Sequence, residues 1–266
     1  MRLMRSVFGK GVRDQRWAFL GWGLGVGLLV LIEAAVWPSI RDMPNFDELM
    51  KNYPEAMRKL FNVQEMTTGT GFMNAELFTL ILPMLFIFYG VSRGARMVAG
   101  EEERGYLETV LVTPVSTRSL LLQKAAALAT GVAALGVVLA VVLVSCSAVF
   151  DMGIGLGETF VGCLAMVLLG LEFGWLALGV GAATGRRAVA IGVGGGAAVA
   201  AYVLYALGQL VDSVEAYQTL SPFHQALHNG PLGDGVPLTM IWVALGAVTA
   251  VVAAVPVFDH RDLRLH

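Results

Sequence analysis

The chain has 266 residues, of which 56% are hydrophobic, only 14% are charged and 32 are glycine, and its formal net charge is −2. Soluble domains carry about 25% charged residues, so this composition excludes a disordered chain and argues against an ordinary water-soluble globule. A nearly neutral charge gives no reason to expect a nucleic-acid partner. The two cysteines, Cys146 and Cys163, lie in apolar runs and supply no disulfide framework.

Residues 1–16 carry five basic residues and one acid. Leu3, Met4, Val7 and Phe8 can share one face of a helix. This pattern predicts an amphipathic interfacial helix that lies on the anionic lipid of the inner leaflet. A disordered basic tail is the alternative.

Six apolar segments follow, and each has about the 20 residues needed to cross ~30 Å of hydrocarbon. They cover approximately residues 17–36, 77–99, 120–150, 160–183, 188–211 and 236–258. The sequence therefore predicts an all-α, polytopic integral membrane protein in which residues 1–266 form a single six-helix transmembrane domain. Pro83 is expected to kink the second span. Trp17 and Trp37 bracket the first span, as aromatic residues that anchor a helix at the interface would.

Lysine and arginine are divided unevenly between the two sides of this arrangement. If the N-terminus is inside, 14 of the 18 basic residues lie inside and four lie outside. The positive-inside rule therefore places both termini in the cytoplasm and the chain in the cytoplasmic membrane. Residues 37–76 then form the longest external loop, in which two short amphipathic helices are expected. The abundance of glycine and alanine points to a bacterial source.

Several glycines are spaced four residues apart, a pattern that lets helix backbones approach closely in lipid. The pairs are Gly21 with Gly25, Gly23 with Gly27, and Gly192 with Gly196. They predict a closely packed bundle, and dimerisation is a second use for them.

Polar residues in unusual places supply two further candidates. Glu172 falls near the middle of the fourth span, where a charge costs about 2.5–3.5 kcal/mol on insertion scales. It should face the bundle interior, be paired or be protonated, either as a lining residue of a substrate or proton path or as a structural hydrogen-bonding group. His224 and His228 have the i, i+4 spacing of metal ligands, but no third ligand has a matching spacing, so histidines on a short surface helix are the preferred interpretation.

The stretch between the second and third spans, residues 100–124, carries the most information about function. Glu101, Arg104 and Glu108 are spaced to pair along one helical face. An apolar ridge lies on another face and consists of Leu107, Val110 and Leu111.

Pro114 should end this short helix, and Ser116 or Thr117 can cap the helix that follows. Residues 100–118 therefore predict a coupling helix at the cytoplasmic membrane surface, with an apolar ridge and a charged flank. Such a helix suits a groove on a soluble partner.

This stretch resembles the type-2 family of ATP-binding-cassette export permeases. The family pattern is an acidic cluster, then Gly-Thr-Leu-Glu, two leucine-like positions, Pro-Val-Ser and a basic residue, ending near a lysine. The corresponding residues here are Glu101, Glu102, Glu103, Arg104, Gly105, Leu107, Glu108, Val110, Leu111, Pro114, Val115, Ser116, Arg118 and Lys124. Tyr106 stands where the family usually has threonine, and Ser221-Pro222-Phe223 followed by Pro231-Leu232 is similar to the family's stretch before its last span.

The resemblance implies a permease subunit that exports a substrate while a separate ABC ATPase subunit binds and hydrolyses ATP with Mg. It also implies a second permease subunit, identical or different, because such exporters usually have twelve spans. The chain has no G-x-x-x-x-G-K-[ST] phosphate loop, so no catalytic activity, metal or cofactor is expected in the chain itself. The alternatives are a non-transporting scaffold or sensor that recruits an ATPase, and a membrane-embedded enzyme, for which no catalytic motif is present.

Overall fold

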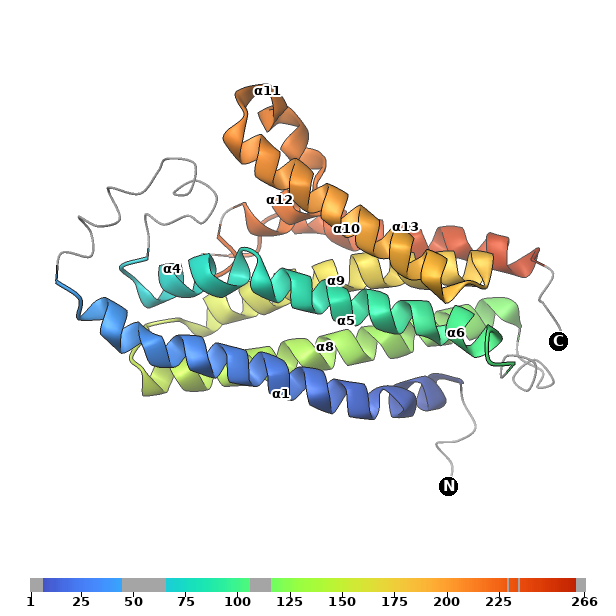
Figure 1. Cartoon of the computed structure of the whole chain (residues 1–266), viewed down its shortest axis with the longest axis horizontal. Coiled ribbons are helices and arrows are strands. Elements are labelled where there is room, and N and C mark those ends of the chain that lie inside the picture. Colours follow the sequence, from blue (N-terminus) through green and yellow to red (C-terminus); the bar gives the residue numbers. More distant parts are fainter. Residues whose placement is uncertain (1–6, 45–65, 106–115, 229, 234, 262–266) are drawn as a thin grey trace.

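The computed structural model describes residues 7–44, 66–105, 116–228, 230–233 and 235–261 (Figure 1). Regular secondary structure in these residues is helical throughout, which confirms the all-α fold. Five helices are long and apolar enough to cross a membrane, and one bent pair of helices makes a sixth span if it is counted as one.

Four of the five long helices run roughly side by side, and the fifth, α10 (Arg187–Leu210), crosses them obliquely (Figure 1). The other four are α1 (Val7–Arg41), α8 (Thr117–Val149), α9 (Leu156–Thr184) and α13 (Met240–Asp259). The turn between α9 and α10 is short because Gly185 adopts a left-handed conformation with φ 65°, which ends α9 at once.

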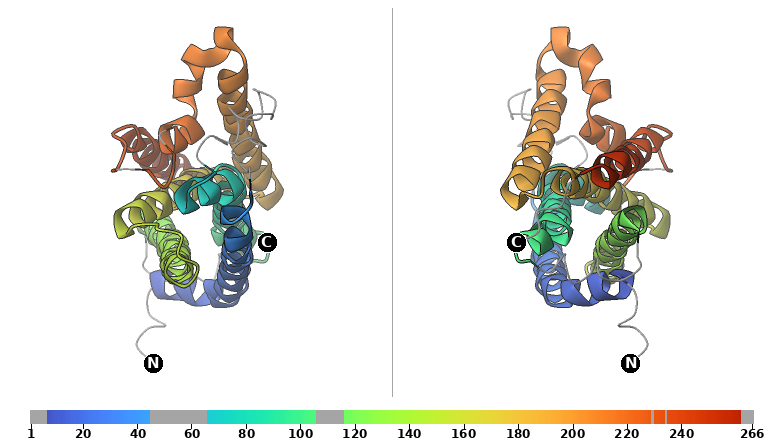
Figure 2. Two further views of the ribbon diagram at one scale, coloured as in Figure 1. Left: turned by 90° about the vertical axis from the view of Figure 1, so that its left-hand side faces the viewer. Right: turned by 90° about the vertical axis from the view of Figure 1, so that its right-hand side faces the viewer.

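The first helix is longer than the sequence predicted. Residues 7–16, expected in a separate interfacial helix, instead form the first turns of α1 and continue into the span without a break. Gln15 ties these turns to α8, because its buried side chain donates hydrogen bonds to the carbonyl oxygens of Gly11, at 3.1 Å, and of Ala127 in α8, at 2.9 Å. The start of α1 is thereby held against α8, and Figure 2 shows these first turns running across the end of the bundle, the direction that a helix at a membrane surface would take.

The second span is bent by 43°. It begins with α4 (Gly69–Met73) and the π-helical turn η3 (Asn74–Phe78), and it continues as α5 (Ile81–Met97). The break falls just before Pro83, which has no N–H to donate to the carbonyl of Thr79 and whose ring crowds that carbonyl. The predicted kink is confirmed and lies about one turn before the proline.

The region predicted as an external loop, residues 37–76, contains more helix than expected at both its ends. The first helix α1 extends to Arg41, and Thr68 caps α4 by accepting a hydrogen bond from the N–H of Gly71 at 3.0 Å. Trp37 is only 3% exposed and packs on Phe72, with ring centroids 5.6 Å apart, so its predicted role as an interface anchor is wrong. The two short helices expected in the loop lie in residues 45–65, outside the described residues.

Helix α9 occupies the centre of the bundle and contacts α5, α8, α10 and α13. In the most apolar 18-residue stretch of α9, 61% of the residues are buried inside the bundle. The corresponding stretches of the other four long helices are 22–39% buried. The outer faces of those helices carry exposed apolar side chains, as lipid-facing surfaces do. Examples are Leu24 and Leu28 in α1, Val141 in α8, and Ile241 and Val252 in α13.

Glycine permits the closest approach between two helices, α5 and α9. A β-carbon on Gly90 would overlap the carbonyl oxygen of Gly170, and one on Gly94 would overlap that of Gly174. Both members of this contact are small-xxx-small pairs, and neither was among the pairs predicted to pack.

The glycine pairs that were predicted behave differently from one another. Gly23 and Gly27 face Val138 and Val142 of α8, and a β-carbon there would find ordinary contacts at 3.9 and 3.6 Å. The other two pairs, Gly21 with Gly25 and Gly192 with Gly196, have no neighbour within 4 Å.

The far part of α10 leaves the bundle and projects from it in every view (Figures 1 and 2). The chain returns through α11 (Asp212–Glu215), η4 (Ala216–Leu220) and α12 (Pro222–Leu227). The fully buried Phe223 anchors this return against Tyr202, with ring centroids 5.4 Å apart.

The two histidines of this return stack on each other. The rings of His224 and His228 lie 4.8 Å apart, and within the described residues no group of three potential metal ligands forms around them. His228 is exposed, whereas His224 is partly buried beside Tyr205.

The glycine contact between α5 and α9 makes a testable prediction. Gly90→Ala should destabilise the protein by about 1–3 kcal/mol, because the new methyl group meets a backbone carbonyl that moves only if the helices separate. Gly192→Ala is the matched control, since it adds the same methyl group in open space and should leave stability unchanged or slightly raised. Thermal unfolding in detergent measures both, and equal melting temperatures for the two variants would contradict the packing argument.

Candidate functional site: three glutamates at the charged end of the bundle

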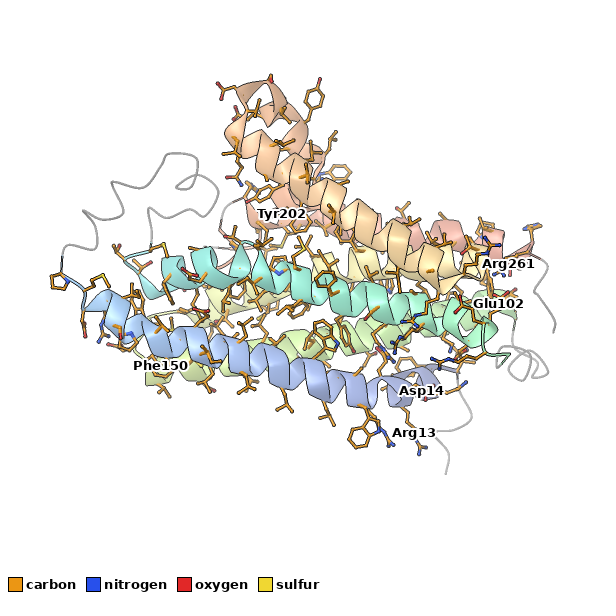
Figure 3. The ribbon with its side chains drawn as sticks, viewed as in Figure 1. Arg13, Asp14, Glu102, Phe150, Tyr202 and Arg261 are labelled. Carbon is orange, nitrogen blue, oxygen red and sulfur yellow. The ribbon has the colours of Figure 1, made fainter. Side chains whose placement is uncertain are left out.

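One end of the bundle gathers the charged residues, and we call it the charged end. It consists of the first turns of α1, α8 and α10, the last turns of α5, α9 and α13, and the short helix α6 (Ala99–Glu102). Figure 3 shows four labelled residues there: Arg13, Asp14, Glu102 and Arg261. Helix α6 begins two residues after α5 ends, so the bent second span determines where the three consecutive glutamates lie.

Glu101 joins α6 to α1 and α8. Its Oε1 atom accepts from Lys124 Nζ at 2.6 Å and lies 3.4 Å from Lys10 Nζ. The side chain of Lys124 is only 2% exposed, so it depends on this carboxylate for its charge partner. The sequence had suggested Arg104 as the partner of Glu101, and the structure brings in cations from two other helices instead.

Glu102 joins α6 to the segment after α13. It is 6% exposed and forms an ion pair with Arg261, whose Nη1 atom also donates to the carbonyl oxygen of Ala182 in α9 at 2.7 Å. Gly185 leaves room for this pair, because a β-carbon there would stand 2.7 Å from Glu102 Oε1. The Gly185 position thus needs glycine both for its backbone conformation and for the close approach of a buried ion pair.

Glu103 caps α10 from outside that helix. Its Oε1 atom accepts a hydrogen bond from the backbone N–H of Arg187 at 2.8 Å, whereas the N-cap residue Arg186 supplies no side-chain cap of its own. A carboxylate at a helix N-terminus satisfies a free N–H group and is favoured by the helix dipole.

The remaining residues of the predicted coupling helix fall into two sets. Gly105 has φ 71°, which allows the chain to turn away from α6, and Ser116 caps α8 as predicted by accepting from the N–H of Ser119 at 3.2 Å. Arg104 lies beside a cavity at the charged end, and Arg118 is exposed. The other predicted residues lie outside the described residues: Leu107, Glu108, Val110, Leu111, Pro114 and Val115.

Two of the cations that pair with these glutamates could not be predicted from residue spacing along the sequence. Arg261 reaches Glu102 across 159 positions, and Lys10 reaches Glu101 across 91. Gln15, only 3% exposed, also accepts from the hydroxyl of Tyr89 at 3.3 Å and so joins α1 to α5 just inside the charged end. The one available signal was the rarity of such polar residues in otherwise apolar helices.

Glu172 lies apart from this cluster, between α9 and α13. A β-carbon on Gly246 of α13 would come within 2.6 Å of its Oε1 atom, so the carboxylate rests directly against that helix. Its Oε2 atom is buried and has no hydrogen-bond partner within the described residues.

Apolar helices with lipid-facing outer surfaces and one charged end define a polytopic helical membrane protein. The sequence also matches, over residues 4–259, the family model described as "Multidrug efflux system permease Rv1217c, C-terminal domain". The chain therefore belongs to this family and is a transporter permease, which confirms the resemblance to exporter permeases seen in residues 100–124. Among curated proteins, none matches the sequence.

The buried pair of Glu102 and Arg261 can be tested by a double-mutant cycle. Glu102→Gln should destabilise the protein by about 3–5 kcal/mol, because it leaves the Arg261 charge buried without its partner. Adding Arg261→Gln should restore much of that loss. The control is Arg41→Gln, which breaks an exposed pair with Asp42 and should change the melting temperature little. Strictly additive effects of the two substitutions would show that the pair does not interact.

Proposed function

We propose that this chain is the transmembrane permease subunit of an ABC-type exporter in the cytoplasmic membrane. A separate ATPase subunit binds ATP and Mg, and a second permease subunit completes the complex. The cargo that we infer is the class named in the family description, drug-like compounds that are exported from the cell.

The observation that carries this proposal is the set of ion pairs and hydrogen bonds that connects α6 to the other helices. Its two glutamates and the C-cap residue Glu103 contact α1 and α8, the segment after α13, and the start of α10. Arg261 extends the connection to α9. A force applied to the chain that follows α6 would therefore reach all these helices at once. A bundle with two arrangements could convert that force into alternating access, driven by a shift in population.

The charged end supports the cytoplasmic orientation of the proposal. Of the lysines and arginines among the described residues, eleven lie at this end and only Arg41 lies at the other. The positive-inside rule then places the charged end, with α6 and the start of α1, in the cytoplasm where an ATPase would be.

Docking of the ATPase tests the proposal. Because Glu101 and Glu102 hold the bundle together, the informative substitution is Glu108→Lys, which reverses a charge on the predicted outer flank of the coupling segment. We expect it to reduce co-purification of the co-expressed ATPase at least tenfold while the permease remains monodisperse. Glu215→Lys, an exposed charge reversal in α11, is the matched control and should retain the ATPase.

Two results of that experiment would contradict the proposal. The first is full retention of the ATPase by Glu108→Lys, and the second is a permease that binds no ATPase at all. If the permease stimulates ATP hydrolysis by the ATPase in reconstituted vesicles but no solute crosses the membrane, the scaffold alternative is favoured.

Glu172 is our candidate for a polar residue of the substrate path. A structural carboxylate would have a hydrogen-bond partner on a neighbouring helix, and the buried Oε2 atom has none within the described residues. Glu172→Gln should therefore alter drug-stimulated ATPase activity of the complex several-fold and leave its basal rate unchanged, with Glu215→Gln as the control. Unchanged stimulation by every drug tested would remove Glu172 from the path.

A further inference from the structure

A cavity of about 650 Å³ opens at the charged end, between the start of α1, the end of α5 and α6. Seven of the residues that line it are lysine or arginine, and only two are acidic. Its arginines are Arg13, Arg16, Arg93, Arg96 and Arg104. The cavity overlaps the ion pairs of Glu101, because Glu101, Lys10 and Lys124 all line it, whereas the pair of Glu102 and Arg261 lies outside it.

Among the described residues, the five arginines of this cavity outnumber the carboxylates that line it. Glu101 is already engaged by Lys124 and Lys10, so Asp14 is the one other carboxylate that lines the cavity. Arg93 donates through Nη2 to the backbone carbonyl of Asp14 at 3.1 Å, and its Nε atom is buried without a partner within the described residues. Several guanidinium groups around one hollow form a site for an anion with several acceptor oxygens, above all a phosphate group.

The position of the cavity indicates where such an anion would come from. Trp17 lines its edge and is 72% exposed, and the next outward residues of α1, Leu20 and Leu24, are 50% and 67% exposed as lipid-facing side chains. The mouth of the cavity therefore lies at the boundary between hydrocarbon and water, where tryptophan is favoured and lipid phosphates lie.

We propose that this cavity binds a phosphate-bearing anion, supplied by the headgroup of an anionic phospholipid in the leaflet at the charged end. A soluble phosphate has the same chemistry and would use the same arginines. The bound anion would neutralise arginines of α1 and α5 together and so hold these two helices to each other. The proposal does not depend on an ATPase partner, so it stands or falls separately from the exporter function.

Lipid retention measures this binding directly. The purified permease is placed in nanodiscs of phosphatidylglycerol and phosphatidylcholine, and the lipids that remain bound are identified by native mass spectrometry. We expect selective retention of phosphatidylglycerol, with affinity about fivefold weaker for each arginine removed. The cavity variants are Arg96→Gln and Arg13→Gln.

The matched control is Arg186→Gln, which removes one exposed arginine at the same end of the bundle but outside the cavity. Arg13 is exposed, so Arg13→Gln should not disturb folding. If Arg96→Gln does not fold, Arg13→Gln alone measures the contribution of a cavity arginine to lipid binding. A second arm adds inorganic phosphate to protein in neutral detergent and follows the melting temperature.

The arms separate the two sources of phosphate. Loss of phosphatidylglycerol in the cavity variants but not in Arg186→Gln supports the headgroup. A rise in melting temperature with inorganic phosphate, abolished by Arg13→Gln and accompanied by no lipid retention, supports a soluble phosphate in the same cavity. Binding of neither, or equal loss in Arg186→Gln, overturns the proposal.

Discussion

The contact of backbone with backbone between α5 and α9 is the constraint on which the rest of the structure depends. Four glycines allow it, because any side chain at Gly90 or Gly94 would meet a carbonyl oxygen of α9. In lipid, where apolar side chains gain little by leaving the solvent, such close packing is a main source of helix association. Helix α9 is thereby fixed at the centre of the bundle, and the end of α5 carries α6 to the charged end.

The charged end follows a different physical rule from the apolar middle. Glu102 and Lys124 are both buried, and removing each charge from water costs free energy. The ion pairs that they form, with Arg261 and Glu101 respectively, offset this cost only if their geometry is good, so they are weak evidence for stability. Such pairs can contribute specificity, because these glutamates reach their cations only when the helices are correctly arranged. A cluster of this kind can have a second arrangement in which the partners change, and a permease that alternates between two states needs such an element.

The cationic cavity and the glutamate cluster lie next to each other and meet at Lys10, Glu101 and Lys124. Lysines of α1 and α8 are neutralised by α6, whereas the arginines of α1 and α5 face an open hollow. In our proposal, a phospholipid headgroup would supply the negative charge that the described residues around the cavity lack.

The sequence alone determined the all-α membrane fold, the approximate positions of the spans, the kink before Pro83 and the cap at Ser116, because hydropathy, proline and capping act over a few neighbouring residues. Only the tertiary structure decided which glycines pack, since Gly90 and Gly21 have the same local pattern and differ in what stands opposite them. It likewise decided that residues 7–16 are joined to the first span in one helix, that Trp37 is buried, and that Glu101 pairs with Lys124 and Lys10. These outcomes depend on contacts between residues distant in the chain, which spacing along one helix cannot reveal.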